Sequence, residues 1–246
     1  MTAQPSIAPR SAQRPDRAAP TLVQRIEDLI LDEGLGPGDS MPTEPELCER
    51  LGASRSSVRE AMRTLASLDI VEVRHGHGTF VGRLSLSPLV DGLLFRARMN
   101  HGNDLRTLRE VVQIRIALDL AVADELVERY RDTPMPELPG LVDAMRARTA
   151  EGKGFAEEDS AFHAALMSVL DNELVQQLGH AFWQIHTIAL PALGIAPSRD
   201  ILDTVDAHRA MLDALAAGDV DAYREAVVAH YRPLQRVLES RESVRA

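Results

Sequence analysis

Residues 41–82 read MPTEPELCERLGASRSSVREAMRTLASLDIVEVRHGHGTFVG and carry the signals of several structural elements in succession. Thr43 and Glu46 form the pattern Thr-x-x-Glu, which is typical of a helix start because the two side chains satisfy each other's free backbone amides. The helix that begins there is predicted to run to Leu51. Gly52 and Ala53 then make a tight turn, and Ser54 is the expected N-cap of a second helix. Two helices joined by such a turn predict a helix-turn-helix.

The second helix of this pair has one apolar face and one basic face. At helical spacing, the inner face is predicted to hold Val58, Met62, Leu65 and Leu68. The outer face keeps Arg55, Ser56, Arg59 and Arg63. Arginines exposed near the start of the second helix are what a DNA-recognition helix requires.

The sequence after this helix alternates between apolar and polar residues. IVEVR at 70–74 and TFVGR at 79–83 predict two short strands, with HGHG at 75–78 as the turn between them. The turn has two other interpretations, a metal site and a phosphate-binding loop. A phosphate-binding glycine loop would open a helix, however, and the two histidines have no third ligand nearby. We therefore predict a hairpin that forms the wing of a winged helix.

Composition and charge are compatible with a soluble DNA-binding protein. The 246 residues are enough for one large domain or two smaller ones. The net charge of -10 argues against non-specific binding to nucleic acid, yet residues 54–83 carry five arginines against three acidic residues. Such a local basic region can serve DNA binding, because contacted phosphates respond mainly to nearby charge.

The segments before the helix-turn-helix have simple interpretations. Residues 1–20 are rich in Pro, Ala and Arg and lack the apolar core of a signal peptide, so we expect a disordered arm. Residues 22–33, LVQRIEDLILDE, predict an amphipathic helix. No apolar run reaches the roughly 18 residues of a membrane span. Cys48 is the single cysteine, which excludes an internal disulfide and fits a reducing, cytoplasmic environment.

The remainder of the chain is predicted to be helical, after a connector at 84–103. The expected helices lie at about 104–131, 137–150, 155–169, 171–190, 199–217 and 219–240. No strand pattern occurs among them, so an antiparallel bundle is the natural arrangement. The predicted fold is thus mainly α, with an N-terminal winged helix-turn-helix at 21–83 and a helical bundle at 104–240.

Four residues of the predicted bundle have the spacing of a metal site. Asp159 and His163 are four residues apart and share one face of a helix. Gly218 and Asp219 separate two helices, and His208 and His230 each lie about 15–17 Å from that turn, hence level with one another. One carboxylate and three imidazoles suit Zn²⁺, Ni²⁺ or Mn²⁺. Spacing alone leaves open that these residues are unrelated.

Arg115 lies inside the apolar stripe of its predicted helix, where a guanidinium needs an anionic partner. Asp119, one turn on, is one such partner, and the carboxylate of a bound effector is the other. Trp183 and His186 share the helix HAFWQIHTIAL and could line the same pocket, although Trp183 is also a natural core residue. His101 and His180 lack such a spacing and are assigned to the surface or the core.

Residues 41–82 resemble the winged helix of GntR-family transcription regulators. The family pattern is Pro-Ser-Glu-Arg-Glu-Leu, then Ser-Arg-x-x-Val-Arg-Glu-Ala-Leu, then Gly-x-Gly-Thr-Phe-Val. The helical remainder resembles the effector domain of the FadR-type branch, and its Asp-x-x-x-His, His and His match the metal-holding pattern of that branch. One departure is Pro45, which stands where the family usually has an arginine and so removes a contact with phosphate or base.

The resemblance implies a function and a set of site residues. It implies a homodimer that binds operator DNA and responds to a small organic acid bound at a divalent metal, with zinc expected first. The implied metal ligands are Asp159, His163, His208 and His230. The implied DNA-binding residues are Ser54, Arg55, Ser56, Arg59, His75 and Gly76. Arg115 and His186 are the expected effector-binding residues.

Two other classes of protein remain as alternatives. A metal-dependent enzyme acting on small acids could use the same four ligands to activate water. We nevertheless expect no enzyme, because no separate acid or base accompanies the ligands and no nucleotide motif occurs. A constitutive DNA-binding protein whose bundle only dimerises is the other alternative, and it would not need a metal.

Overall fold

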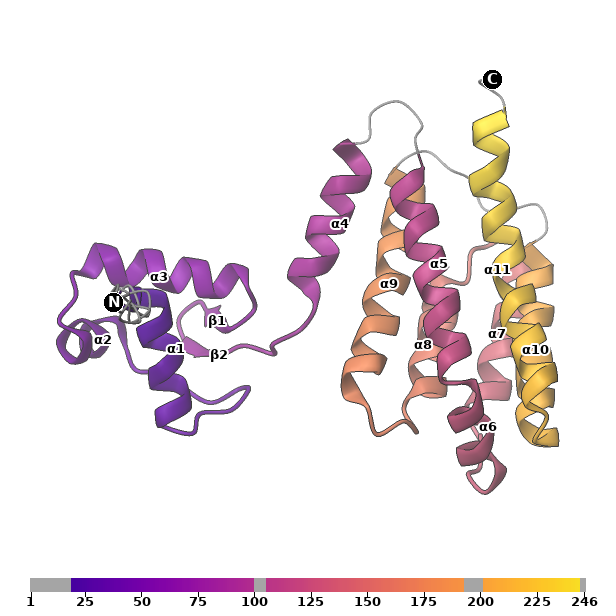
Figure 1. The fold of residues 1–246 in the computed structure, drawn as a ribbon, viewed down its shortest axis with the longest axis horizontal. Helices are drawn as coiled ribbons and strands as arrows, with labels where there is room; N and C mark the ends of the chain where they lie inside the picture. Colours follow the sequence, from indigo (N-terminus) through magenta and orange to yellow (C-terminus); the bar gives the residue numbers. More distant parts are fainter. Residues whose placement is uncertain (1–18, 100–104, 193–200, 244–246) are drawn as a thin grey trace, which may run out of the picture. The chain divides into compact units, whose positions relative to one another are not determined.

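The computed structural model describes residues 19–99, 105–192 and 201–243. The chain divides into two compact units, Met1–Leu84 and Ser85–Ala246, whose elements are labelled in Figure 1. Each unit has its own hydrophobic core. In the part of the chain that is described, no helix combines the length and the apolar character needed to cross a membrane.

The first unit consists of three helices and a hairpin. In chain order these are α1 (Leu22–Asp32), α2 (Glu44–Leu51), α3 (Arg55–Ser67), β1 (Val71–Arg74) and β2 (Gly78–Val81). The predicted caps are confirmed: the Thr43 N–H donates to Glu46 Oε2 at 2.7 Å, and Ser54 Oγ accepts from the Ser57 N–H at 3.1 Å. The core between the helices is fully apolar at its centre, with Ile26, Leu47, Val58 and Leu65.

The predicted wing is also confirmed. β1 and β2 are antiparallel, with Val71 opposite Val81 and Arg74 opposite Gly78. Gly76 and Gly78 have φ angles of 77° and 105°, which only glycine adopts easily, so the turn explains both glycines.

One buried position was predicted wrongly. Leu68 was expected on the inner face of α3, but 46% of it is exposed. The helix ends at Ser67, and the chain reverses at Asp69, where φ is 56°. Ile70, after the reversal, packs against the core instead.

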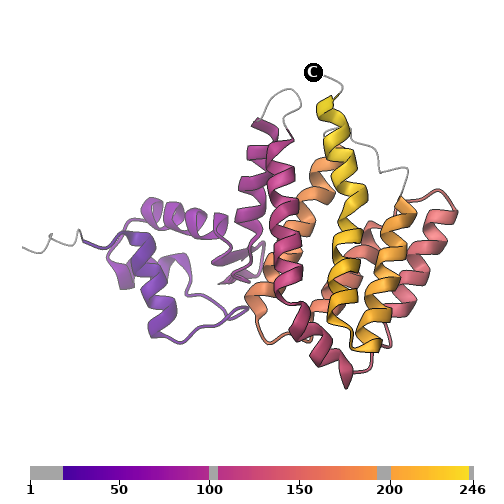
Figure 2. The ribbon, with the colours of Figure 1, turned by 45° about the vertical axis from the view of Figure 1, so that its right-hand side comes forward.

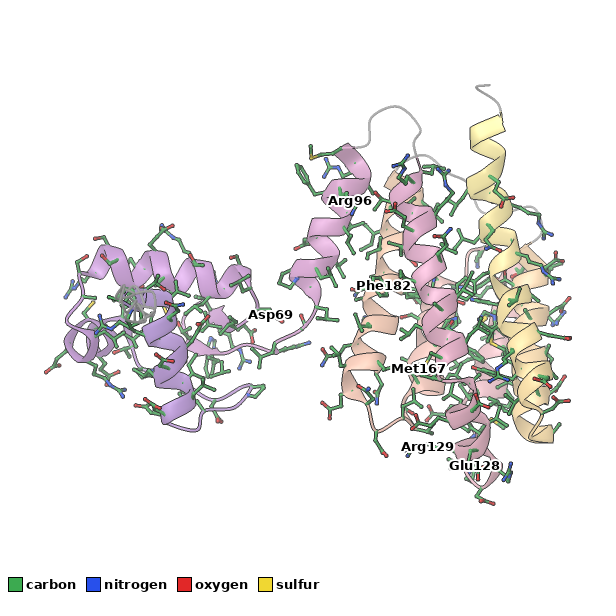
Figure 3. All side chains as sticks on the ribbon, viewed as in Figure 1. Asp69, Arg96, Glu128, Arg129, Met167 and Phe182 are labelled. Carbon is green, nitrogen blue, oxygen red and sulfur yellow. The ribbon has the colours of Figure 1, made fainter. Side chains whose placement is uncertain are left out.

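The elements of the second unit that the structure describes are all helices, joined by turns and loops. Its elements are α4 (Ser87–Met99), α5 (Arg106–Ala121), α6 (Ala123–Arg131), α7 (Leu138–Ala150), α8 (Ala156–Met167), α9 (Glu173–Ala192), α10 (Ile201–Ala217) and α11 (Val220–Ser243). Figures 1 and 2 both show α10 and α11 side by side, and α5 beside α9. The largest buried side chains among them include Phe162, Tyr223 and Tyr231. Figure 3 shows side chains filling the space between these helices, where Met167 lies.

Two predicted boundaries in this unit need correction. The segment 84–103, predicted to be a connector, contains α4, which packs on α9 and α5. Its buried Val90 and Ala97 are seven residues apart, so the helical pattern was present in the sequence. Arg96 of α4, labelled in Figure 3, forms an ion pair with Glu110 of α5, with 3.2 Å between the nitrogen and oxygen atoms. The predicted helix 104–131 is in fact two helices, because Val122 has non-helical dihedrals.

Candidate metal centre and adjoining cavity

Three helices of the second unit bring the four predicted metal-binding residues together. Asp159 and His163 come from α8, His208 from α10 and His230 from α11. Each offers one ligand atom, and these atoms all lie within 4.8 Å of one another. The α10–α11 hairpin turns at Gly218, where φ is 67°, and therefore places His208 and His230 level, as their distances from the turn predicted.

The separations between these atoms suit a first-row divalent ion. His208 Nε2 lies 3.1 Å from Asp159 Oδ1 and 3.4 Å from His163 Nε2. His163 Nε2 lies 3.7 Å from the same carboxylate oxygen. Ligands bound tetrahedrally at about 2.1 Å from a zinc ion are about 3.4 Å apart. Small movements of the side chains would therefore complete a coordination sphere.

The bonding of the cluster also leaves room for a cation. Asp159 Oδ1 faces the histidines and is buried without a hydrogen-bond donor, and Nδ1 of His208 and of His230 is likewise buried without a partner. Buried polar atoms in native proteins are nearly always satisfied, because an unmade bond is costly. A cation among these residues would accept the lone pair that Asp159 Oδ1 now gives to no donor.

The protonation states of the cluster are those of a ligand set. Burial lowers the pKa of His163 to about 3, against the attraction of Asp159. Burial also holds the pKa of His230 well below its usual value. For Asp159, burial would raise the pKa, but the close approach of His208 and the other two neighbouring histidines outweighs it and keeps the pKa well below the usual range. At neutral pH the carboxyl is thus ionised and these two imidazoles have a lone pair free to bind metal.

A cavity of about 280 Å³ adjoins the cluster between α5, α8 and α9. Its walls include His163 of the cluster, Arg115 and Asp119 of α5, and Trp183 of α9. Arg115 is only 4% exposed, which confirms that it lies inside the apolar stripe of α5.

Asp119, one of the two partners considered for Arg115, lies in this region together with Tyr231. Burial raises the pKa of Asp119, while the charge of Arg115 and the hydrogen bond from Tyr231 lower it. The Tyr231 hydroxyl donates to Asp119 Oδ2 at 2.5 Å, and the Arg115 guanidinium carbon lies 5.0 Å from the Tyr231 ring centre. Arg115 therefore lies near Asp119 and the Tyr231 ring and also forms part of the cavity wall.

Other predicted residues fall in different places. Trp183 is buried and lines the cavity, and its Nε1 also donates to Asp159 Oδ2. His180, assigned to surface or core, lines the same cavity one turn before Trp183, with its ring inclined by only 14° to the indole. The side chain of His186 and the whole of His101 lie outside the described residues. Tyr231 was missed, because nothing in its spacing shows that it reaches Asp119.

The predicted DNA-binding residues gather at two places in the first unit. Ser54, Arg55, Ser56 and Arg59 lie exposed at the start of α3, and His75 and Gly76 lie exposed in the turn of the hairpin. Arg59 Nε donates to Glu44 Oε2 of α2 at 2.8 Å. The position of the Arg59 guanidinium is thus set by the other helix of the pair.

Comparison with known families accounts for both units. The family model "FCD domain" matches residues 110–233, and the model "Bacterial regulatory proteins, gntR family" matches residues 19–81. The chain belongs to the GntR family. As a GntR-family protein with an FCD domain, it is a DNA-binding transcription regulator and not an enzyme. The expected fold class, a helix-turn-helix unit followed by a helical domain, is confirmed as well.

Relatives of this GntR-family protein are themselves regulators. It is 41% identical over 104 residues to the putative transcriptional regulatory protein NedR of Micromonospora viridifaciens, covering 42% of this chain and 75% of NedR. It is 24% identical to the galactonate operon transcriptional repressor of Escherichia coli K12, covering 78% of this chain and 84% of that repressor. The solved structure of a GntR protein from Streptococcus agalactiae covers 90% of this chain and 98% of its own, with 27% identity and a TM-score of 0.60.

Proposed function

We propose that this regulator binds a small carboxylate in the cavity of its second unit, beside a divalent metal held by Asp159, His163, His208 and His230, and that binding alters its affinity for operator DNA. One observation carries the proposal. The same cavity has His163 of the four-residue cluster in one wall and the buried Arg115 in another. A ligand in this space would reach both a metal and a guanidinium.

The charge of the site favours an acid. One carboxylate and three neutral imidazoles leave a divalent ion with a formal charge of +1, and Arg115 adds a second positive charge beside it. Asp119 offsets this charge less than an exposed aspartate would, because burial raises its pKa. An entering carboxylate would make charge-assisted hydrogen bonds in a site of low dielectric constant. When bound, the metal would supply a Lewis-acid contact for one carboxylate oxygen.

Zinc is the ion we propose first, because a set of three histidines and one aspartate suits it well. Nickel and manganese accept the same ligands. Two relatives also point to acids. One is named for a galactonate operon and another, from Escherichia coli K12, for an L-lactate dehydrogenase operon. Galactonate and lactate are both hydroxycarboxylates, which supports an organic acid as the effector class here.

We assign DNA binding to residues 21–83 and effector binding and dimerisation to residues 104–240, on which α4 of the segment 84–103 packs. Most of the proposed arm, residues 1–20, lies outside the described residues. Arg55 and Arg59 are placed to contact guanine edges or neighbouring phosphates, with Ser54 and Ser56 beside them. His75 and Gly76 would place the wing near the minor groove. Pro45 removes the contact that an arginine at this position would make.

Regulation requires that the effector favour one arrangement of the proposed homodimer over another. A ligand with equal affinity for both arrangements would change nothing, however tightly it bound. The acid therefore has to make different contacts in the DNA-bound and the free states.

The proposal is tested by a melting-temperature screen of small organic acids against zinc-loaded and metal-free protein. A ligand at 100 times its Kd adds about 2.7 kcal/mol of stability, which such a screen detects. We expect one class of acid to raise the melting temperature of the zinc-loaded protein only. Purified protein that takes up no divalent metal, or an effector that proves uncharged, would refute it.

A further inference from the structure

Trp183 contacts both the four-residue cluster and the cavity. Its indole Nε1 donates to Asp159 Oδ2, while Asp159 Oδ1 faces His163 and His208. The two oxygens of one buried carboxylate are therefore used differently. One is held by a tryptophan of α9, and the other points to the histidines with no hydrogen-bond donor.

We propose that Trp183 is a positioning residue that restricts Asp159 to a single oxygen ligand and thereby preserves a metal coordination position for the effector. This inference rests on the metal site proposed above. Free carboxylates bind metal ions through one oxygen or through both. The indole N–H occupies Asp159 Oδ2 and fixes the rotation of the carboxylate, so that only Oδ1 reaches the ion.

The number of ligands explains why this restriction matters. Asp159 and the three histidines supply four protein atoms, and zinc sites that accept a further ligand expand to five. If Asp159 bound through both oxygens, the second oxygen would take the position that the effector's carboxylate needs. Residues that form hydrogen bonds with a metal ligand usually contribute to metal affinity, and their mutation typically lowers that affinity 10–100-fold.

The other face of Trp183 links this restriction to effector binding. The indole forms part of the cavity wall, next to the nearly parallel ring of His180. An effector in the cavity would thus contact the side chain that orients Asp159. Trp183 is also the only tryptophan of the chain, so its emission reports on this one place.

The test uses Co²⁺ as the probe, because its visible absorption depends on coordination number and geometry. Trp183→Phe keeps an apolar ring but removes the N–H. Phe182→Leu is the matched control, an aromatic change at the neighbouring position of α9 that lines neither the cavity nor the four-residue cluster. We expect Trp183→Phe to bind Co²⁺ about 10–100-fold more weakly and with a changed absorption spectrum. Phe182→Leu should bind Co²⁺ like the parent. In the parent, bound Co²⁺ should quench the emission of Trp183.

The outcomes separate the two proposals. A parent that takes up no Co²⁺ refutes the metal site and, with it, the role of Trp183. A parent that binds Co²⁺ while Trp183→Phe shows the same affinity and spectrum refutes the role of Trp183 alone. If Trp183→Phe does not fold, the Trp183 emission of the parent is the test. Bound Co²⁺ that leaves this emission unchanged overturns the inference, and quenching that is complete at one equivalent of Co²⁺ supports it.

Discussion

Replacement of His208 by alanine should abolish the stabilisation that zinc gives to the second unit. His208 is fully buried, and its Nε2 lies within 3.4 Å of possible ligand atoms on both Asp159 and His163. With zinc at 100 times its Kd, the parent gains about 2.7 kcal/mol. For a domain of this size, that gain raises the melting temperature by about 5–10 °C.

Loss of one ligand of four should remove nearly all of this gain. If the Kd rises on the order of 1,000-fold, the same zinc concentration is only a tenth of the new Kd and adds less than about 0.1 kcal/mol. His208→Ala also leaves a cavity, which lowers stability with or without metal. The measured quantity is therefore the difference in melting temperature between zinc-loaded and chelated samples, because the cost of the cavity enters both.

His180→Ala is the control for this experiment. It removes a histidine from the cavity wall but no member of the four-residue cluster, so it should keep the zinc-dependent difference of the parent. A zinc-dependent shift in His208→Ala as large as in the parent would show that the four residues do not hold the ion together. Elemental analysis of the same samples gives the metal content directly.

Three further predictions concern other parts of the molecule. Arg55→Ala and Arg59→Ala should each weaken operator binding, by about 1–3 kcal/mol for a lost base contact; parent-like gel shifts for both would show that α3 is not the recognition helix. Arg115→Lys should bind the acid found in the screen more weakly, because lysine lacks the two-pronged geometry of arginine; equal affinity by calorimetric titration would leave Arg115 a structural role only. In chelated protein, the melting temperature should fall between pH 7 and pH 5, because the unfolded chain binds protons at His163 and His230 below about pH 6.5. Burial lowers both pKa values in the folded state, so stability is present above this range and lost below it, and a constant melting temperature would contradict their burial.

The features that could be predicted from sequence are those that depend on local spacing. The Thr43–Glu46 cap and the glycine turn of the wing involve neighbouring residues whose backbone preferences are strong. The four-residue cluster could be predicted from the sequence for a similar reason. Asp159 and His163 share one helix face, and a single tight turn fixes the levels of the two other histidines.

The features that were missed depend on how helices rotate and dock against one another. The hydrogen bonds from Trp183 to Asp159 and from Tyr231 to Asp119 join different helices, and no spacing within one helix indicates them. The break at Val122 has no glycine or proline to mark it. Helix α4 is a different case, since its apolar pattern is present in the sequence of a segment that was predicted to be a connector.

The separation of the four cluster residues along the chain has a consequence for the order of assembly. His208 and His230 belong to one helical hairpin, which closes a short loop and can form early. His163 of α8 lies 45 residues before His208 in the chain, so its contact with His208 closes a longer loop. Two imidazoles alone make a weak site, so we expect the ion to bind only after α8 has docked. Zinc should then slow unfolding while leaving the refolding rate almost unchanged, which stopped-flow measurements with and without chelator would reveal. Newly made protein would therefore pass through a metal-free folded state before it binds the ion.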